Sequence, residues 1–396
     1  MRVLKTEKIP IMMWLEDIED NAMEQVKNLT NLPFAKKLIA LMPDCHSGYG
    51  MPIGGVLATK GVIIPNAVGV DIGCGMCAVK TSLTDIDTDT LKDIMGRIRK
   101  VVPVGFRKHK EKQDIKLMPG RSWEQTVNMD KYTPIVEKEF NNALKSLGTL
   151  GGGNHFIEIQ KGDDGFIWIM IHSGSRNLGK QVADHYNNIA IKLNEKWFSQ
   201  VPTKWELAFL PVDTEEGQSY IYEMNYCVEF ALANRELMMS RVMQCFRDAL
   251  GLEEPYDPIF DKPINIAHNY ARQENHFGEN LWIHRKGATS ARVGELGIIP
   301  GSMGTKSYIV EGLGNKLSFE SCSHGAGRVM GRKEAIRTLD LKKEQEIMKD
   351  VLGKPRSQED LEEAPSAYKD IDMVMENQKD LVKTLVELKP LAVIKG

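Results

Sequence analysis

The stretch Phe166-Ile167-Trp168-Ile169-Met170-Ile171 is an unbroken apolar run that ends in His172-Ser173-Gly174. Successive side chains of a strand point to opposite faces, so a run without polar alternation predicts a strand buried on both faces. The polar residues that follow predict a site at the C-terminal end of this strand.

The patterns on either side of this strand predict one compact α+β unit over residues 1–396. Residues 1 to about 80 and 281–323 combine short apolar segments with glycine-rich turns, which indicates strands. Residues 180–250 are also open to interpretation as a helical insertion. Apolar residues at helical spacing predict helices over 84–100, 131–147, 180–200, 218–250, 332–352 and 370–388.

The composition excludes several classes of protein. The net charge is −3 and 42% of the residues are hydrophobic, which fits a globular domain and argues against a protein that coats nucleic acid non-specifically. Six scattered cysteines do not resemble a disulfide framework and favour a reducing compartment. Residues 1–5 have no apolar signal region, and no apolar run approaches the ~18 residues of a membrane span. We therefore expect a soluble, cytoplasmic protein with no membrane partner.

Candidate metal ligands occur in glycine-rich settings. In Asp71-Ile72-Gly73-Cys74, a carboxylate and a thiol can converge on one ion if the backbone turns at the glycine. A buried structural cysteine is the plainer interpretation of this motif alone. Imidazole is a common metal ligand, although a lone histidine is more often structural. Four histidines lie beside small residues: His155, His172, His268 and His324.

A donor set of thiolate, imidazole and carboxylate suits zinc, manganese or iron. A single thiolate could bridge two ions, and paired ions can clamp phosphoryl oxygens. Among the other histidines, His185 and His276 are expected in structural or surface roles, and His46, His109 and His284 are weaker candidates.

Anion-binding groups are also present. The stretch from Pro300 to Ser307 suggests a nest of backbone amides, although an empty tight turn fits equally well. Arg176 and Arg328 follow small-residue runs and could grip phosphate, or could be salt-bridge partners. The segment 105–125 reads as a mobile loop, and its cations from Arg107 to Lys112 are either RNA phosphate contacts or a solvated basic loop.

Taken together, these motifs resemble the RtcB family of RNA-splicing ligases nearly from end to end. The resemblance implies a single compact domain, 1–396, with a central mixed β-sheet core, glycine-rich active-site loops and a helical insertion at about 180–250. It is carried by the blocks 42–50, 70–76, 147–158, 172–176, 265–270, 284–288, 300–307, 323–328 and 395–396.

The resemblance further implies two Mn²⁺ ions, one held by Asp71, Cys74 and His155 and the other by Cys74, His172 and His268. It implies that His324 attacks GTP and carries GMP, and that Arg176 and Arg328 contact substrate phosphate. The nucleotide site would comprise Asn154, His155, Phe156, Ile157, Glu158, His268, Asn269, Pro300, Gly301, Ser302, Met303, Ser307, His324, Gly325, Ala326, Gly327, Tyr368 and Lys395.

The implied reaction joins RNA 3′-phosphate or 2′,3′-cyclic phosphate ends to 5′-hydroxyl ends, in tRNA splicing or RNA repair. Its partners would be RNA, GTP and an activating protein whose existence is open. Two alternatives exist: a metal-dependent RNA cyclic phosphodiesterase that does not ligate, and a non-catalytic RNA-binding protein. Glu158, His324 and Lys395 together disfavour the first, and the complete ligand set disfavours the second.

Overall fold

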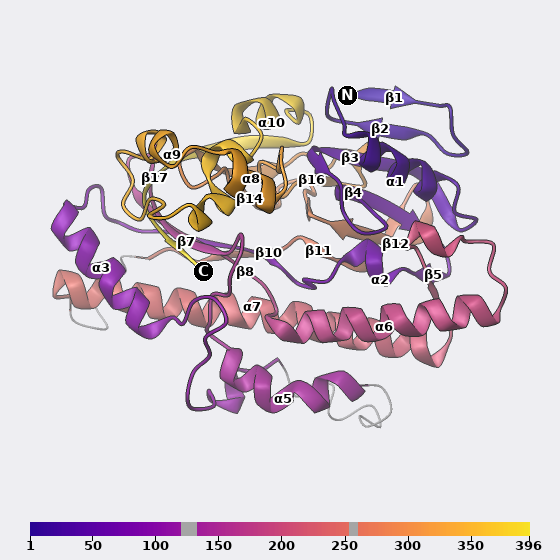
Figure 1. Ribbon diagram of the computed structural model, residues 1–396, viewed down its shortest axis with the longest axis horizontal. Helices are drawn as coiled ribbons and strands as arrows, with labels where there is room; N and C mark the ends of the chain where they lie inside the picture. Colours follow the sequence, from indigo (N-terminus) through magenta and orange to yellow (C-terminus); the bar gives the residue numbers. More distant parts are fainter. Residues whose placement is uncertain (120–132, 253–259) are drawn as a thin grey trace.

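The computed structural model describes residues 1–119, 133–252 and 260–396 (Figure 1). The predicted loop 105–125 is described as far as residue 119, and residues 120–125 lie outside the described part. The first two residues of the predicted helix 131–147 lie outside it as well.

The apolar run of 166–171 forms β8 (Ile167–Ser173), a strand with every residue buried. It lies inside an antiparallel seven-stranded sheet, between β6 (Gly75–Lys80) and β7 (Phe156–Gly162). One face of β8, including Ile169, packs with residues of two helices, and the other, including Met170, packs against the C-terminal part of the chain. The expectation of a strand buried on both faces is confirmed.

The rest of this sheet extends on both sides of that centre. Its order is β10-β6-β8-β7-β17-β15-β14, with outer strands β10 (Ile264–Ala267), β17 (Val382–Lys395), β15 (Ser307–Gly312) and β14 (Leu296–Ile299).

A six-stranded sheet is mixed, because β2 and β3 run parallel and the other neighbours antiparallel. Its order is β1 (Arg2–Leu4), β2 (Ile11–Met13), β3 (Ala35–His46), β4 (Ile53–Thr59), β12 (Glu279–Lys286) and β11 (Asn269–His276). Two small pairs join β13 (Ala288–Ser290) to β16 (Ser321–Ser323) and β5 (Val62–Ile63) to β9 (Leu210–Pro211).

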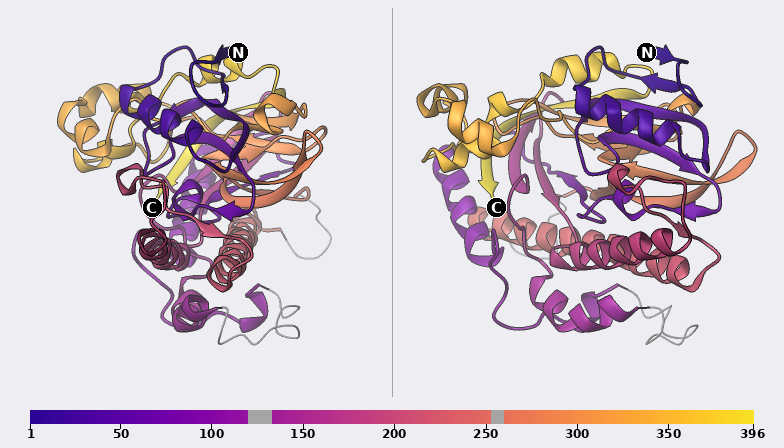
Figure 2. Two further views of the ribbon diagram at one scale, coloured as in Figure 1. Left: turned by 90° about the vertical axis from the view of Figure 1, so that its right-hand side faces the viewer. Right: turned by 45° about the vertical axis from the view of Figure 1, so that its right-hand side comes forward.

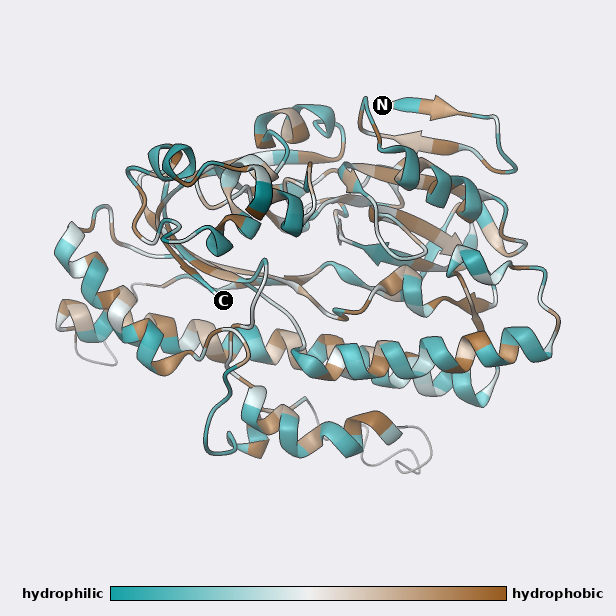
Figure 3. Ribbon diagram, viewed as in Figure 1, coloured by the Kyte–Doolittle hydropathy of each residue, from teal (hydrophilic) through white to brown (hydrophobic). Residues whose placement is uncertain are grey.

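Two long helices, α6 (Asn177–Lys196) and α7 (Glu215–Leu250), lie side by side along the two sheets (Figure 1). In Figure 3 both alternate between hydrophilic and hydrophobic colours, as expected for helices with one face on a core. Helix α5 (Pro134–Ser146) lies on their outer side, as both views in Figure 2 show. That this helical region is an insertion into the domain stays a prediction.

The other helices are short, apart from α3 (Thr88–Val101), which the sequence predicted. The helix α1 (Asp20–Thr30) lies in a region expected to hold only strands and turns. Among the described residues, the remaining α-helices are α2 (Pro65–Val68), α8 (Arg332–Thr338), α9 (Leu341–Ile347) and α10 (Ile371–Asn377).

Two predicted helices are corrected. The helix expected over 332–352 is two helices, α8 and α9, with a break at which Asp340 caps the second by accepting from the amide of Lys343. The helix expected over 370–388 ends at Asn377, and the chain enters β17 at Val382. Strand β17 pairs with both β7 and β15, so sheet pairing overrides the helical spacing.

Candidate active site

The topology of the seven-stranded sheet brings distant residues to one edge. In an antiparallel sheet, the C-terminal end of one strand lies beside the N-terminal end of the next. Thus the end of β10, the start of β6, the end of β8 and the start of β7 are neighbours. The residues at these points are His268, Cys74, His172 and His155.

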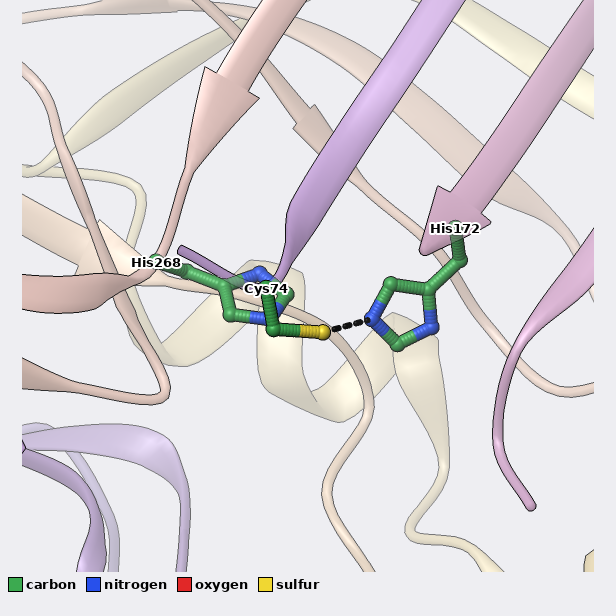
Figure 4. Close-up of side chains that lie close together, drawn as sticks. All are labelled: Cys74, His172 and His268. Carbon is green, nitrogen blue, oxygen red and sulfur yellow. Dashed lines mark hydrogen bonds between the residues drawn. The ribbon is translucent and has the colours of Figure 1, made fainter. Parts of the chain in front are cut away.

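Cys74, His172 and His268 form the first cluster, and their side chains converge from three strand ends (Figure 4). Their candidate ligand atoms all lie within 4.8 Å of one another. The Cys74 Sγ lies 3.3 Å from His172 Nε2. All three residues are buried, so water would compete poorly with the protein ligands.

Asp71, Cys74 and His155 form a second cluster that shares the Cys74 thiol. His155 Nε2 lies 3.5 Å from Cys74 Sγ and 3.2 Å from Asp71 Oδ2. The turn between Asp71 and Cys74 contains Gly73, whose φ is +77°. A side chain there would lie 2.8 Å from the Cα of Val228 in α7, so only glycine lets this turn pack against the helix.

Backbone carbonyls orient two of the imidazoles. His155 Nδ1 lies 2.9 Å from the Leu150 carbonyl, and His172 Nδ1 lies 3.0 Å from the Asn154 carbonyl. A carbonyl only accepts, so Nδ1 carries the hydrogen in each ring and Nε2 keeps its lone pair facing the cluster. This arrangement is common around metal-binding histidines.

Helix α7 holds the strand ends in place through Arg235, which is fully buried. Its guanidinium donates to the carbonyls of Gly73, Ser173 and Ile266, near the three residues of the first cluster. The adjacent Asn234 accepts from the amide of Thr149 and donates to the Ser173 hydroxyl. Neither residue was singled out from the sequence, because a polar pair within a long amphipathic helix gives no local signal of its role.

The residues fit a metal centre. Burial lowers the pKa of His172 and of His268, which keeps both imidazoles neutral and able to coordinate. Burial and the Asp71 carboxylate raise the pKa of the Cys74 thiol, so metal binding would displace a proton. His268 Nδ1 is buried without a hydrogen-bond partner among the described residues. A soft thiolate with imidazoles and a carboxylate suits a transition metal.

His324 stands beside this centre. Its ring centroid lies 4.7 Å from that of His268. Its Nδ1 lies 2.6 Å from Asp44 Oδ2, and its backbone amide donates to the same oxygen. A carboxylate only accepts, so His324 Nδ1 carries the hydrogen and Nε2 is left with a free lone pair, as a nucleophile requires.

Asp44 is a candidate functional residue to which the sequence motifs alone assigned no role. It is fully buried on β3, within the quoted block 42–50, where no role was assigned to it. A carboxylate in the otherwise apolar stretch 38–45 needs a partner to offset its desolvation, and that mismatch was the available signal.

A cavity of about 860 Å³ opens next to His324, large enough for a nucleotide. Many of the expected nucleotide-site residues line it: Asn154, Phe156, Pro300, Gly301, Ser302, Met303, His324, Gly325, Ala326, Gly327, Tyr368 and Lys395. Six do not reach its wall: His155, Ile157, Glu158, His268, Asn269 and Ser307.

Three of these six form polar layers behind the wall. Glu158 is buried and accepts from the Gln160 amide at 2.7 Å, and the same amide donates to the Ser307 hydroxyl. The Asn269 amide donates to the Asp71 carbonyl. Ile157, by contrast, packs into the hydrophobic core between the sheet and helices α3 and α7.

This environment shifts the pKa values of two ionisable side chains, Glu158 behind the cavity wall and Lys395 in it. Burial raises the pKa of Glu158 to about 8, although Lys395 opposes the shift. Burial also lowers the pKa of Lys395, against the attraction of Glu363 and Glu158. Both groups are therefore sensitive to a polar ligand that enters the cavity.

The two expected phosphate-binding arginines differ in their surroundings. Arg176 lies at the metal clusters, with Nη1 3.5 Å from His155 Nδ1. Arg328 lines the cavity but is paired with Glu363 at 3.3 Å, and it donates to the Tyr368 hydroxyl at 3.2 Å. Arg176 therefore lies closer to the expected reaction centre, and Arg328 is bound within a polar network.

The histidines that were weaker candidates also differ in their surroundings. His46 lines the cavity, whereas His284 accepts from the Ile64 amide in the core. His276 is buried against Glu274, which agrees with the structural role expected for it. His109 contacts Arg241, and His185 packs edge-on against Tyr186.

Comparisons with known proteins place this arrangement in a family. The family model described as "tRNA-splicing ligase RtcB" matches residues 25–396. The chain belongs to the RtcB family. It is 40% identical to the RNA-splicing ligase RtcB of Escherichia coli, over 100% of this chain and 99% of that one. It is 33% identical to the tRNA-splicing ligase RtcB of Methanococcus maripaludis, over 96% of this chain and 92% of that one.

The RtcB relationship makes this chain an RNA ligase, and the clustered Asp, Cys and His side chains give it a site suited to metal. Among the described residues, no helix has both the length and the apolar character needed to cross a membrane.

Proposed function

We propose that this ligase joins RNA 3′-phosphate or 2′,3′-cyclic phosphate ends to 5′-hydroxyl ends, with GTP and two Mn²⁺ ions, through a histidine–GMP intermediate on His324. The observation that carries the proposal is that His324 lines a nucleotide-sized cavity while its ring centroid lies 4.7 Å from that of His268, a member of the first cluster. A nucleophile beside a metal ligand and a cavity is what phosphoryl transfer from a bound nucleotide requires.

The residues have distinct roles in this proposal. Asp71, Cys74 and His155 would hold one ion, and Cys74, His172 and His268 the other. Bound there, the ions supply positive charge that stabilises phosphoryl oxygens during transfer. The Asp44 carboxylate holds the His324 ring so that Nε2 faces the α-phosphate and stabilises the positive charge that develops on the ring.

The first step forms a bond between His324 Nε2 and the α-phosphorus of GTP and releases pyrophosphate. The histidine-bound GMP then passes to the RNA 3′-phosphate, and His324 regains its lone pair. In the last step the 5′-hydroxyl attacks the activated phosphate, GMP leaves, and a 3′,5′-phosphodiester remains. A cyclic phosphate end is first hydrolysed to the 3′-phosphate.

Guanine selection rests on Glu158 and Lys395. The Glu158 carboxylate can accept from the N1–H and the exocyclic amine of guanine, a pair that adenine does not offer. An adenine would leave these buried groups unmatched, which disfavours it strongly. Glu158 lies behind the cavity wall, where hydrogen bonds through Gln160 and Ser307 connect it to the amide of Gly301 in that wall, so the base would have to pass the wall to reach it.

For the RNA strand, we propose phosphate contacts at Arg176 and Arg328 and along the basic segment from Arg107 to Lys112. These side chains lie outside the hydrophobic core, and three of the segment's cations are exposed lysines. We place the protein in a reducing cytoplasm. Its six buried cysteines, none of them in a disulfide, agree with such a compartment.

The test is a sealing assay with two short RNAs, one ending in a 3′-phosphate and one starting with a 5′-hydroxyl. We expect a joined product that requires both GTP and Mn²⁺. Opening of a 2′,3′-cyclic phosphate without any joined product, in the presence of GTP and Mn²⁺, would favour the non-ligating phosphodiesterase instead.

A further inference from the structure

One aromatic side chain near the metal clusters has no packing role. Phe106 is 101% exposed, and it lies in the segment from Val104 to His109, which we call the Phe106 loop. Isolated exposed apolar residues are ordinary on protein surfaces. Phe198, which is 92% exposed at the end of α6, is such a residue and serves as a reference.

The backbone of the Phe106 loop is fixed next to the candidate active site. The Gly105 amide donates to the Gly151 carbonyl at 2.8 Å, and Arg176 Nη2 donates to the Gly105 carbonyl at 3.5 Å. The same guanidinium contacts His155, a candidate metal ligand. Two contacts, from Gly105 to Arg176 and from Arg176 to His155, therefore connect the residue next to Phe106 with the second cluster.

The other end of the loop is also anchored. The His109 amide donates to the Lys145 carbonyl of α5 at 3.0 Å, and His109 itself contacts Arg241 of α7. The exposed side chains of Phe106 and Arg107 thus project from a backbone that is held at both ends. A pre-positioned aromatic loses less conformational freedom when a ligand stacks on it.

The charge around Phe106 selects the class of ligand. The segment from Gly105 to Pro119 contains five cationic and two acidic side chains, whereas the whole chain has a net charge of −3. The cations are Arg107, Lys108, Lys110, Lys112 and Lys116, and the acids are Glu111 and Asp114. Single-stranded nucleic acid is bound by this combination, because cations follow the phosphates while bases stack on aromatic rings.

The cavity lies elsewhere along the site. Among the described residues, its wall is built from segments such as 300–303 and 324–332, and it includes no residue of the Phe106 loop. The loop and the cavity therefore share no wall residue, so a nucleotide in the cavity and a strand on this loop could both be present during sealing.

We propose that Phe106 is a stacking platform for a base near the RNA end and that Arg107 contacts an adjacent phosphate. This inference rests on the proposed function, because it supplies the binding site for the RNA strand. Stacking does not depend on the identity of the base, so the loop would hold RNA ends of any sequence.

The test measures affinity for a short single-stranded RNA that carries 2-aminopurine near its end, without GTP. We expect Phe106→Ala to weaken binding about tenfold and to remove the fluorescence change of the stacked base. Phe106→Trp should retain both, and Phe198→Ala should match the wild type. Affinity falls with salt, and Arg107→Glu should make this fall less steep, with the magnitude of the slope of log affinity against log salt smaller by about 0.7.

Labelling of the protein by GTP and Mn²⁺ in the absence of RNA separates this inference from the proposed function. We expect Phe106→Ala to be labelled at the wild-type rate but to seal dilute RNA more slowly, with recovery at saturating RNA. Wild-type affinity, fluorescence and sealing in Phe106→Ala would overturn the platform and leave the ligase proposal standing. Absence of GTP labelling in the wild type would instead overturn the proposed function, while the binding comparison would still decide the role of Phe106.

Discussion

The His324 ring is held by the Asp44 carboxylate, with 2.6 Å between Nδ1 and Oδ2. This bond fixes the tautomer that leaves Nε2 free. In Asp44→Asn, the side-chain amide can donate instead of accept, which would favour the opposite tautomer. We predict that the rate of GTP labelling falls about 10²-fold to 10⁴-fold, while the metal content stays unchanged. Labelling of Asp44→Asn at the wild-type rate would show that this bond does not orient the nucleophile.

The Cys74 thiol belongs to both candidate clusters, so its removal should affect two ions at once. We predict that Cys74→Ala binds less than one Mn²⁺ per chain after loading and gel filtration, where the wild type binds two. Cys77 is a matched control, because it is also fully buried near the start of β6 but belongs to neither cluster. Equal metal content in Cys74→Ala and Cys77→Ala, measured by elemental analysis, would show that the Cys74 thiolate does not bridge two ions.

Arg235 holds three backbone carbonyls and the Asn265 side chain beside the ligands. Replacing it by methionine leaves these acceptors buried without donors. We predict a loss of about 3 kcal/mol or more in the free energy of unfolding, together with weaker metal binding. Urea unfolding and metal titration measure the two effects. The exposed neighbour Glu236 gives the control variant Glu236→Gln. A similar small loss of unfolding free energy in both variants would contradict the role of Arg235 in holding the strand ends.

Glu158 should make guanosine binding depend on pH. Its pKa is raised to about 8 by burial, so the carboxyl is neutral below that pH and becomes an acceptor for both guanine donors above it. We predict that guanosine affinity rises from pH 6.5 through pH 8, where about half of the carboxyl groups are ionised, and levels off about one pH unit higher. Calorimetry in buffers of different ionisation enthalpy should show proton release near pH 7, and Glu158→Gln should show neither effect. A pH-independent wild-type affinity would exclude this carboxylate as the guanine acceptor.

The sequence predicted the parts of the structure that depend on local pattern. The apolar run of 166–171 was correctly read as a strand buried on both faces, and the long helices were correctly read from their spacing. The helix predicted over 370–388 was wrong for the part that forms β17. Pairing with β7 and β15 depends on distant segments, which the local spacing of apolar residues does not report.

The candidate site divides in the same way. Residues in glycine-rich motifs, such as Cys74 and His324, could be proposed from sequence because their motifs are contiguous. Asp44 and Arg235 could not be assigned, since each acts on residues far away in the chain, and strand order alone decides which ends meet.

The most direct test of the account is to locate the nucleotide on the protein. Wild-type enzyme is incubated with Mn²⁺ and GTP labelled at the α-phosphate, digested at neutral to alkaline pH, and its peptides are mapped by mass spectrometry. We predict that GMP is found on the peptide containing His324, in an acid-labile linkage, and that His324→Ala with normal metal content carries none. Label on another residue, or full labelling of His324→Ala, would contradict the account.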